Sequence, residues 1–423
     1  MQKELVHDSY LDQEVDTVKP FDGPVIRFSH IEADNSGLRL YQAEMKHNIY
    51  VLWDKMNNVM LQMPTGTGKT IVFTSIVKDI RRWCIKNSPN SKILIIAHRK
   101  ELIQQASSKL NDIAHGIIQG GKPQNLSYSV QVASIQTFMS RRHYEQMRRE
   151  QFDFIIIDEA HHSMAAGYQK LWDMFPYSKK LGVTATPWRM NHSGFTSLFG
   201  DIVLSHNIEW FVNNGYLSNY DYVSIRRDSE IQKTINSINR YGVDGDYLES
   251  ELSNLFDKDK IRAELYKSYC QFAKGKKGII YAIDRQHAAN IRDLYAAHGV
   301  PICMIDGTTP EIERQELIDN FKTGKIQVIV NVNIFSEGFD CPDIEFIQLV
   351  RPTKSLSMYL QQVGRGLRIS KNKTISIILD NVGLYNRFGT PMANRHWRHH
   401  FIGSDVSGEG YNPKIRNYHP IHD

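Results

Sequence analysis

The sequence is poor in cysteine and contains no long apolar run. Only four cysteines occur in 423 residues, at Cys84, Cys270, Cys303 and Cys341, and none forms a C-x-x-C pair. This spacing gives no basis for a structural zinc site or a disulfide framework. No apolar stretch approaches the ~18 residues that a membrane-spanning helix needs. We therefore expect a globular chain with reduced thiols that uses neither zinc nor a membrane.

The chain also lacks a large excess of either charge. Lys and Arg number 51 against 46 Asp and Glu, which gives a net charge of +5. Such a mildly basic balance is compatible with a polyanionic partner but does not require one. The first twenty residues are charged rather than apolar, so no secretory signal is predicted and we expect a cytoplasmic protein.

One basic and aromatic cluster lies near the C-terminus, from His396 to His400. Two interpretations of this cluster remain open. It is either a solvated terminal segment or a contact for nucleic acid, because cations bind phosphates and aromatic rings stack on bases. Composition alone favours the solvated segment.

Short apolar runs bounded by polar residues recur along the chain and predict buried parallel strands. In the first half they are Val59–Met63, Ile93–Ala97, Val130–Ala133, Phe154–Ile157 and Leu181–Val183. In the second half they are Gly278–Ile283, Val300–Ile305, Ile326–Val330, Ile344–Val350 and Thr374–Leu379. Helical periodicity between the runs predicts an α/β fold in which each sheet is doubly wound.

A chain of this length is too long for one core, and the pattern predicts two tandem lobes. The expected parts are an N-terminal extension (1–36), a first lobe (37–207), a connector (208–260), a second lobe (261–385) and a basic-aromatic tail (386–423). The connector is polar and poor in apolar runs, as expected of one or two exposed helices or a small insertion. The lobes are expected to share one architecture without shared sequence.

The segment M-P-T-G-T-G-K-T, from Met63 to Thr70, lies between a predicted strand and a predicted helix. This is the setting of a phosphate-binding loop, and the usual pattern is met except at Met63. Gly66 and Gly68 let backbone amides approach an anion, Lys69 supplies positive charge, and the Thr70 hydroxyl is offered to Mg²⁺. The alternative is a tight turn with an exposed lysine. The predicted nucleotide contacts are Pro64, Thr65, Gly66, Thr67, Gly68, Lys69 and Thr70.

A pair of carboxylates follows the run Phe154–Ile157, in the sequence D-E-A-H. The carboxyl end of such a strand is the ligand-facing edge of the sheet. We expect Asp158 to hold Mg²⁺ through water and Glu159 to orient and deprotonate an attacking water. His161 is predicted to sense the phosphate state, or else to pack at a helix start.

Two further segments complete the predicted site. Thr184 and Thr186, in T-A-T-P, end another strand and are expected to couple nucleotide state to the second lobe. In Q-Q-V-G-R-G-L-R, helical spacing places Gln361, Arg365 and Arg368 on one face. Arg365 is the predicted arginine finger that stabilises the departing phosphoryl group, which makes hydrolysis depend on lobe closure. Taken alone, G-R-G-L-R would favour a basic surface helix.

The four motifs, in this order, resemble those of the superfamily 2 DEAD/DEAH-box helicases from about Leu38 to Pro391. The resemblance implies two RecA-like lobes with an ATP site in the cleft between them, ATP and Mg²⁺ as cofactors, and an ATP hydrolase that moves on nucleic acid. It also implies that Arg39 and Gln42 in L-R-L-Y-Q read adenine and that Asp340 faces the nucleotide.

Other segments are similar to the strand-contacting motifs of that family, including Ala97–Leu102, Val132–Phe138, Ile279–Ala282 and Ile329–Pro342. We expect side chains near them to hold successive phosphates without reading bases, so that binding is sequence-tolerant and salt-sensitive. Ordinary surface or capping roles are the alternative for each. The predicted contacts are Arg99, Thr137, Thr308 and Ser336.

Within the superfamily, T-A-T-P-W-R and Q-Q-V-G-R-G-L-R are more similar to RadD-like proteins, XPB-type helicases and restriction-enzyme motor subunits than to DEAD-box RNA helicases. The resemblance favours single- or double-stranded DNA as the partner. An ATP-regulated binding switch and an RNA helicase remain the alternatives. RadD-like proteins often carry a cysteine-rich zinc element after the second lobe; this sequence has none, so protein partners that supply targeting are expected.

Overall fold

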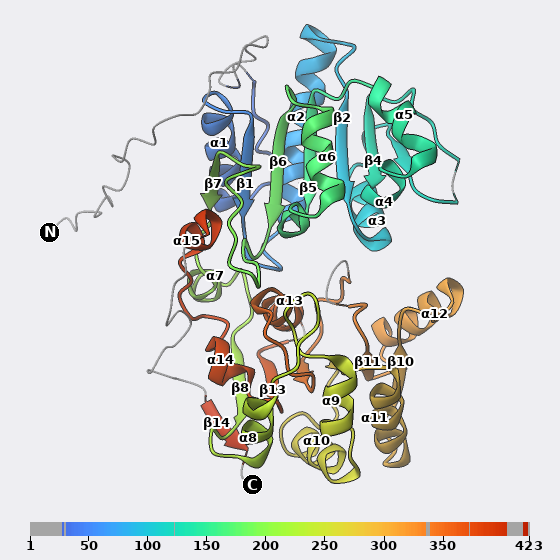
Figure 1. Cartoon of the computed structure of the whole chain (residues 1–423), viewed down its shortest axis with the longest axis vertical. Coiled ribbons are helices and arrows are strands. Elements are labelled where there is room, and N and C mark those ends of the chain that lie inside the picture. Colours follow the sequence, from blue (N-terminus) through green and yellow to red (C-terminus); the bar gives the residue numbers. More distant parts are fainter. Residues whose placement is uncertain are drawn as a thin grey trace, which may run out of the picture.

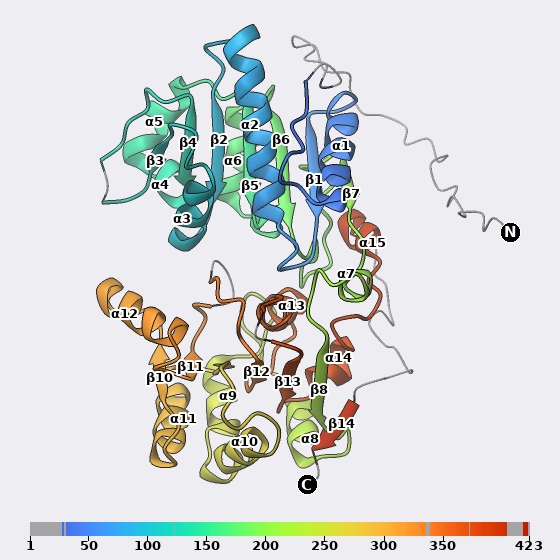
Figure 2. The ribbon, with the colours of Figure 1, turned by 180° about the vertical axis from the view of Figure 1, so that it is seen from behind.

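The computed structural model describes residue 28, residues 31–121, 123–335, 339–371 and 373–403, and the backbone of 418–421. These residues form two α/β lobes placed one above the other along the long axis of the molecule (Figure 1). Within the described residues each lobe contains one seven-stranded parallel sheet. Helices cover both faces of the sheets, as the two opposite views show (Figures 1 and 2).

The sheet of the first lobe has the strand order β3-β4-β2-β5-β6-β1-β7. Its strands are β1 (Asn58–Gln62), β2 (Ile93–Ala97), β3 (Gly116–Ile118), β4 (Val130–Ser134), β5 (Phe154–Asp158), β6 (Lys179–Thr184) and β7 (Asp201–Leu204). Its helices are α1 (Leu40–Trp53), α2 (Lys69–Asn87), α3 (Lys100–Lys109), α4 (Ile135–Phe138), α5 (Arg141–Arg149), the 3₁₀ turn Ala160–His162, α6 (Ala166–Met174) and α7 (Ile208–Asn213).

The sheet of the second lobe has the order β10-β11-β9-β12-β13-β8-β14. Its strands are β8 (Tyr220–Ile225), β9 (Gly278–Tyr281), β10 (Ile302–Ile305), β11 (Val328–Asn331), β12 (Phe346–Leu349), β13 (Ser376–Asp380) and β14 (Tyr418–Ile421). The remaining helices are α8 (Glu230–Ser237), α9 (Glu249–Phe256), α10 (Asp259–Phe272), α11 (Arg285–Ala297), α12 (Glu311–Lys322), α13 (Leu356–Gly366), α14 (Leu384–Phe388) and α15 (Trp397–Ile402).

The strands form where apolar runs occur because parallel strands are covered on both faces. All five residues of β2 and all five of β5 are buried. Each of the ten predicted runs coincides with a strand, with ends shifted by no more than two residues. The two lobes also share one strand order, because adding seven to each strand number of the first sheet gives the second. The prediction of two doubly wound lobes with one architecture is therefore confirmed.

The connector differs from its prediction. β8 lies inside residues 208–260, yet it pairs in parallel with β13 and belongs to the second sheet. Asp221 and Ser224 interrupt the apolar residues of its sequence, Y-D-Y-V-S-I, so it does not form the continuous apolar run that marks a buried strand. The two expected helices are α8 and α9, which bury Ile235, Leu252 and Phe256.

The described part of the tail contacts both lobes. α15 packs against β7 of the first lobe, Phe195 N donates to Phe401 O at 2.8 Å, and Arg398 pairs with Asp201 at 2.7 Å. β14 pairs with β8 of the second sheet. Within the predicted cluster, His396, Arg398 and His399 are exposed, whereas His400 is buried, so both interpretations of the cluster stay open. Among the described residues, no helix combines the length and apolar character needed to cross a membrane.

Candidate active site

A cavity of about 250 Å³ lies where the first lobe meets α13 of the second lobe. Side chains from both lobes line it, although they are up to about 330 positions apart in the sequence. Both predicted carboxylates and three of the predicted arginines are among them. The lining residues are Arg39, Thr65, Gly66, Gly68, Lys69, Thr70, Ile71, Leu102, Gln105, Lys109, Asp158, Glu159, Tyr216, Asp340, Pro342, Arg365, Arg368 and Ile369.

The phosphate loop is shaped by two glycines with positive φ. Gly66 has φ +87° and Gly68 has φ +92°, which side chains other than glycine rarely adopt. A Cβ on Gly68 would also lie 2.4 Å from Gln42 Nε2. The loop is held from within, where Thr67 Oγ1 donates to Pro64 O at 2.8 Å. Thr67 and Pro64 therefore shape the loop, while Thr65, Gly66, Gly68, Lys69 and Thr70 face the cavity.

Gln42 braces the loop from α1. Its Nε2 donates to Thr67 O at 3.0 Å, and its Oε1 accepts from Arg39 N at 3.0 Å. The Arg39 guanidinium lies 5.0 Å from the ring centroid of Tyr216, and both side chains line the cavity. Tyr216 was not predicted, because it belongs to a different segment of the chain and no motif surrounds it.

Lys69 begins α2 and carries positive charge into the cavity. Its Nζ donates to Met63 O at 3.3 Å. Burial lowers the pKa of Lys69, and the carboxylates of Glu159 and Asp158 oppose that shift. An ammonium in this position gains most from an anionic ligand, since burial has removed much of its hydration.

The predicted carboxylates meet at the end of β5. Asp158 is 4% exposed and Glu159 is 6% exposed, and Glu159 N donates to Asp158 Oδ1 at 3.0 Å. Glu159 also has φ +50°, an uncommon conformation for a residue with a side chain. Two buried carboxylates beside a lysine are the donor set that binds a divalent cation or activates water.

A chain of polar contacts connects Glu159 to β6. His161 Nδ1 lies 3.4 Å from Glu159 Oε2 and 3.1 Å from Thr184 Oγ1. Thr184 Oγ1 in turn accepts from Thr186 N at 3.1 Å. The residues predicted to couple nucleotide state to the second lobe are thus connected to one another, and the coupling itself stays a prediction.

The second lobe presents two arginines to the cavity. Arg365 lies on α13, and its Nη1 donates to Phe339 O at 2.9 Å. Arg368 Nη1 donates to the same carbonyl at 3.0 Å and pairs with Asp340. Burial, followed by repulsion from Arg365, lowers the pKa of Arg368 to about 10. The lowered pKa shows that the charged guanidinium loses hydration in this site. A negatively charged ligand would compensate for that loss.

The predicted helix face needs one correction. α13 ends at Gly366, so Arg368 lies past the helix end rather than on its face, and the chain turn brings it beside Arg365. Gln361 is on α13 and is 4% exposed, but it does not line the cavity.

Gly364 has a role that the sequence analysis missed. A Cβ at this position would lie 2.6 Å from the Cβ of Thr65, so the absence of a side chain lets α13 approach the phosphate loop. A signal was present, because glycine inside a helix costs stability relative to alanine and indicates a packing reason.

The segments of the predicted strand contacts are joined through neighbouring residues, since Gln136 donates to His98 O at 3.0 Å and Arg314 both donates to Thr309 O and pairs with Glu101. Arg99 Nη1 donates to Asn333 O at 2.8 Å and so joins the two lobes. Thr137 Oγ1 accepts from Gly120 N at 2.9 Å. Thr308 Oγ1 donates to Asp306 Oδ1 at 2.8 Å, within the loop that precedes α12. Ser336 lies outside the described residues.

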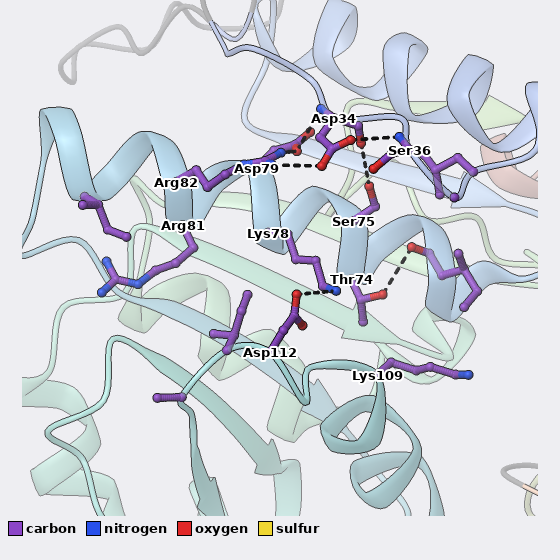
Figure 3. A pocket seen from close by; sticks show the side chains of 16 residues that line it. Asp34, Ser36, Thr74, Ser75, Lys78, Asp79, Arg81, Arg82, Lys109 and Asp112 are labelled. Carbon is purple, nitrogen blue, oxygen red and sulfur yellow. Dashed lines mark hydrogen bonds and ion pairs between the residues drawn. The ribbon is translucent and has the colours of Figure 1, made fainter.

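A larger groove of about 700 Å³ runs along α2 beside this cavity and shares Ile71 and Lys109 with it. Figure 3 shows Lys78 directed at Asp112 and Arg82 directed at Asp34 and Asp79. Lys78 pairs with Asp112 at 2.8 Å, and Arg82 pairs with Asp34 at 3.0 Å. The predicted catalytic residues Asp158, Glu159 and Arg365 line the smaller cavity and not this groove, so the smaller cavity remains the candidate active site.

The comparisons with known proteins agree with this geometry. Residues 35–189 match the type III restriction enzyme res subunit, and residues 259–370 match the helicase conserved C-terminal domain. A 51.5 kDa protein of a Lactococcus phage is 32% identical over 344 residues, which cover 81% of this chain and 70% of that protein. The putative ATP-dependent helicase IRC3 of Saccharomyces cerevisiae is 30% identical over 76% of this chain, but the match spans only 48% of that protein.

Two further similarities bear on the family. The DNA 3'-5' translocase XPB2 of Sulfurisphaera tokodaii is 27% identical, over 82% of this chain and 81% of that protein. A fragment of a putative HsdR subunit of a type I restriction enzyme from Vibrio vulnificus has a TM-score of 0.62 at 20% identity. That likeness covers 84% of this chain and 66% of the fragment, and shows the fold alone.

Two parallel-sheet lobes, with a phosphate loop on one and paired arginines on the other, define the class of two-lobed ATP hydrolases. The chain belongs to the superfamily 2 helicases, a family of ATP-dependent helicases and translocases.

Proposed function

We propose that this protein is a DNA-stimulated ATPase that uses hydrolysis to translocate on, unwind or remodel DNA. The observation that carries the proposal is the shared cavity, in which Lys69 and Glu159 of one lobe face Arg365 of the other. Hydrolysis that needs groups from both lobes depends on how the lobes are arranged, and a motor requires that dependence. DNA is favoured over RNA because a relative that matches most of this chain is named as a DNA translocase.

The residues of the cavity fit ATP with Mg²⁺. The loop with positive φ at Gly66 and Gly68 leaves no side chain between its backbone and an anion, and Lys69 lies half-buried beside it. Thr70 and Asp158 would hold Mg²⁺, which would neutralise charge on the phosphate oxygens. Arg39 and Tyr216 form the flat, cationic and aromatic part of the lining that suits a base.

The chemistry follows from the positions of three groups. Glu159 is the carboxylate available to orient the attacking water and take its proton. Lys69 neutralises the terminal phosphates from the first lobe, and Arg365 stabilises the charge that develops on the leaving phosphoryl group from the second lobe. ATP thus favours contact between the lobes, and hydrolysis weakens that contact.

Two polar contacts away from the cavity also join the lobes. Arg99 donates to Asn333 O, and Arg314 on α12 pairs with Glu101 on α3 at 3.2 Å. Both involve the segments predicted to contact the strand. A change in lobe arrangement would therefore alter the strand grip, as translocation requires.

Steady-state ATP hydrolysis tests this proposal, measured without nucleic acid and with single-stranded DNA, double-stranded DNA or RNA. Glu159→Gln is the control, because it keeps the shape of the side chain but removes the base. We expect DNA to stimulate hydrolysis and the substitution to abolish it, with ATP binding retained. Stronger stimulation by RNA would instead indicate an RNA helicase. ATP binding without stimulation by any nucleic acid would indicate a switch activated by a protein partner.

A second assay separates movement from clamping. We expect wild-type protein with ATP to displace a third strand from a triplex or one strand from a partial duplex. DNA-stimulated hydrolysis without displacement of either would support a regulated clamp in place of a motor.

A further inference from the structure

A second cavity, of about 500 Å³, lies between the lobes on the side of α14 and α15. Three of its residues follow β6 of the first lobe, and the others come from the connector, the second lobe and the tail. We call it the basic-aromatic cavity. It is lined by Trp188, Met190, His192, Tyr241, Gly245, Lys354, Leu356, Arg387, Phe388, Arg395 and His400.

The lining combines cations with aromatic rings. Lys354, Arg387 and Arg395 supply positive charge, and Trp188, Tyr241 and Phe388 supply rings, whereas none of the described residues that line the cavity is Asp or Glu. The groove of Figure 3 differs, because Lys78 and Arg82 are paired there with carboxylates of the same lining. A lining that carries Lys354 and Arg387 and includes no carboxylate among its described residues favours an anionic ligand.

The arrangement of these groups further restricts the chemical class of the ligand. The Lys354 ammonium lies 3.9 Å from the centroid of the Tyr241 ring, and Tyr241 is 45% exposed. Arg387 is exposed, and α13 begins at Leu356 in the wall of the cavity, so the positive end of this helix adjoins it. Alternating phosphates and flat bases match cations placed beside rings, as in proteins that bind single strands.

We propose that the basic-aromatic cavity binds a nucleic-acid strand, with phosphates at Lys354 and Arg387 and a base stacked on Tyr241 or Trp188. This inference rests on the proposed function and adds a binding site to it. The cavity is distinct from the predicted contacts at Arg99 and Thr137, which follow β2 and β4, because β5 lies between those strands and β6.

The site also adjoins both elements that lead to the nucleotide. On one side, Trp188 follows Thr184 and Thr186, the residues joined to Glu159 through His161. On the other side, α13 begins at the basic-aromatic cavity and carries Arg365 to the nucleotide cavity near its far end. A strand bound here would contact both lobes and favour the arrangement in which both sets of catalytic groups face each other.

The test is fluorescence anisotropy of a labelled oligothymidylate with the full chain over a range of salt concentrations. We expect Arg387→Gln to weaken binding and to reduce the slope of log K against log salt by about 0.7, the value for one phosphate contact on a single strand. Tyr241→Ala is expected to weaken binding about 5-fold or more, through loss of stacking, and Tyr241→Phe to restore it. Arg81→Gln, in the groove of Figure 3, is the matched control and should bind like wild type.

The outcomes separate this inference from the proposed function. If DNA stimulates hydrolysis by wild-type protein but Arg387→Gln and Tyr241→Ala bind the strand unchanged, the inference is overturned and the proposed function stands. If only Arg387→Gln weakens binding, the phosphate contact stands and the stacking on Tyr241 is overturned. If wild-type protein binds no strand at any salt concentration, the inference is overturned, and the proposed function then stands only if double-stranded DNA stimulates hydrolysis.

Discussion

The two lobes have one topology and opposite chemistry. Each parallel sheet has the same strand order, and in each the carboxyl ends of the strands point to one edge. In the first lobe that edge carries Lys69, Asp158 and Glu159, whereas the second lobe contributes Arg365 and Arg368. The comparison shows that the sheet fixes where loops emerge, while the residues in the loops decide what the edge does.

The difference between the lobes is clear from the segments that follow two equivalent strands. β1 is followed by the phosphate loop, but its equivalent, β8, is followed by R-R-D-S and the short helix α8. A cavity of about 410 Å³ at that position is lined by Arg227, Gln232 and Asn386 among others, and Arg227 Nε donates to Asn386 Oδ1 at 3.0 Å. Without a glycine loop and a lysine, this position lacks the means to hold phosphates as the first lobe does.

The largest effect is expected from removing the contribution of the second lobe to catalysis. Arg365→Gln should lower the rate of DNA-stimulated ATP hydrolysis by about 1000-fold or more, the magnitude typical of an arginine finger. ATP binding should change much less, because the phosphate loop belongs to the first lobe. Hydrolysis and binding of a fluorescent ATP analogue are the measurements, with Arg292→Gln on α11 as the control. Equal losses in binding and turnover would contradict this division between the lobes.

The next effect tests whether only the first lobe holds phosphates. Lys69→Ala should reduce hydrolysis by about 100- to 1000-fold, because a half-buried positive charge that faces the phosphates is lost. It should also weaken ATP binding, whereas Arg227→Ala at the equivalent edge of the second lobe should leave both near wild type. The same binding and turnover assays decide the matter. A comparable loss in Arg227→Ala would show that the second lobe has a nucleotide site of its own.

A smaller effect is expected from separating the lobes slightly. Gly364→Ala places a methyl group against Thr65 and should push α13 from the phosphate loop. Misplacement of this kind can cost up to about 100-fold in rate. Hydrolysis should fall while the melting temperature stays close to that of wild type. Gly120→Ala is the control, because its new methyl would meet only Thr137 Oγ1, at 3.6 Å, and hydrolysis that is unaffected in both variants would contradict the proposed contact.

The smallest effect concerns buried charge on equivalent strands. Lys180 on β6 is buried, and burial lowers its pKa to about 7, whereas burial raises the pKa of Asp380 on β13. Between about pH 7 and its ordinary pKa of 10.5, Lys180 is neutral in the folded chain and protonated in the unfolded chain. Unfolding therefore takes up a proton, and the free energy of unfolding rises with pH in this window.

From pH 7 to pH 9 the rise due to Lys180 should be about 2 kcal/mol. Lys180→Met should remove most of it, although Lys179, whose pKa burial lowers to about 8, contributes in the same direction. Urea unfolding followed by circular dichroism at the two pH values measures the difference. Asp380 has the opposite sign, because a raised pKa stabilises at low pH and this contribution is lost as pH rises. An unchanged pH dependence in Lys180→Met would assign it to other groups.

The sequence predicted the parts of this protein that depend on local pattern. Apolar runs marked ten strands because a parallel strand buried on both faces needs apolar residues at every position. The phosphate loop and the carboxylates of Asp158 and Glu159 were recognisable because each follows its strand directly. β8 was not predicted, because polar residues interrupt its apolar ones. It becomes a strand by pairing with β13, about 150 residues later in the chain.

Only the tertiary structure determined which residues contact each other across the two lobes. Arg99 and Asn333 are 234 positions apart and share a hydrogen bond, and Gly364 touches Thr65 only because α13 is brought to the phosphate loop. Arg368 reaches the cavity through the turn after α13, which helical spacing does not describe. A local pattern determines the conformation of a segment, but the contacts between distant segments depend on how two separately formed sheets pack against each other, and that packing is not encoded in any single segment.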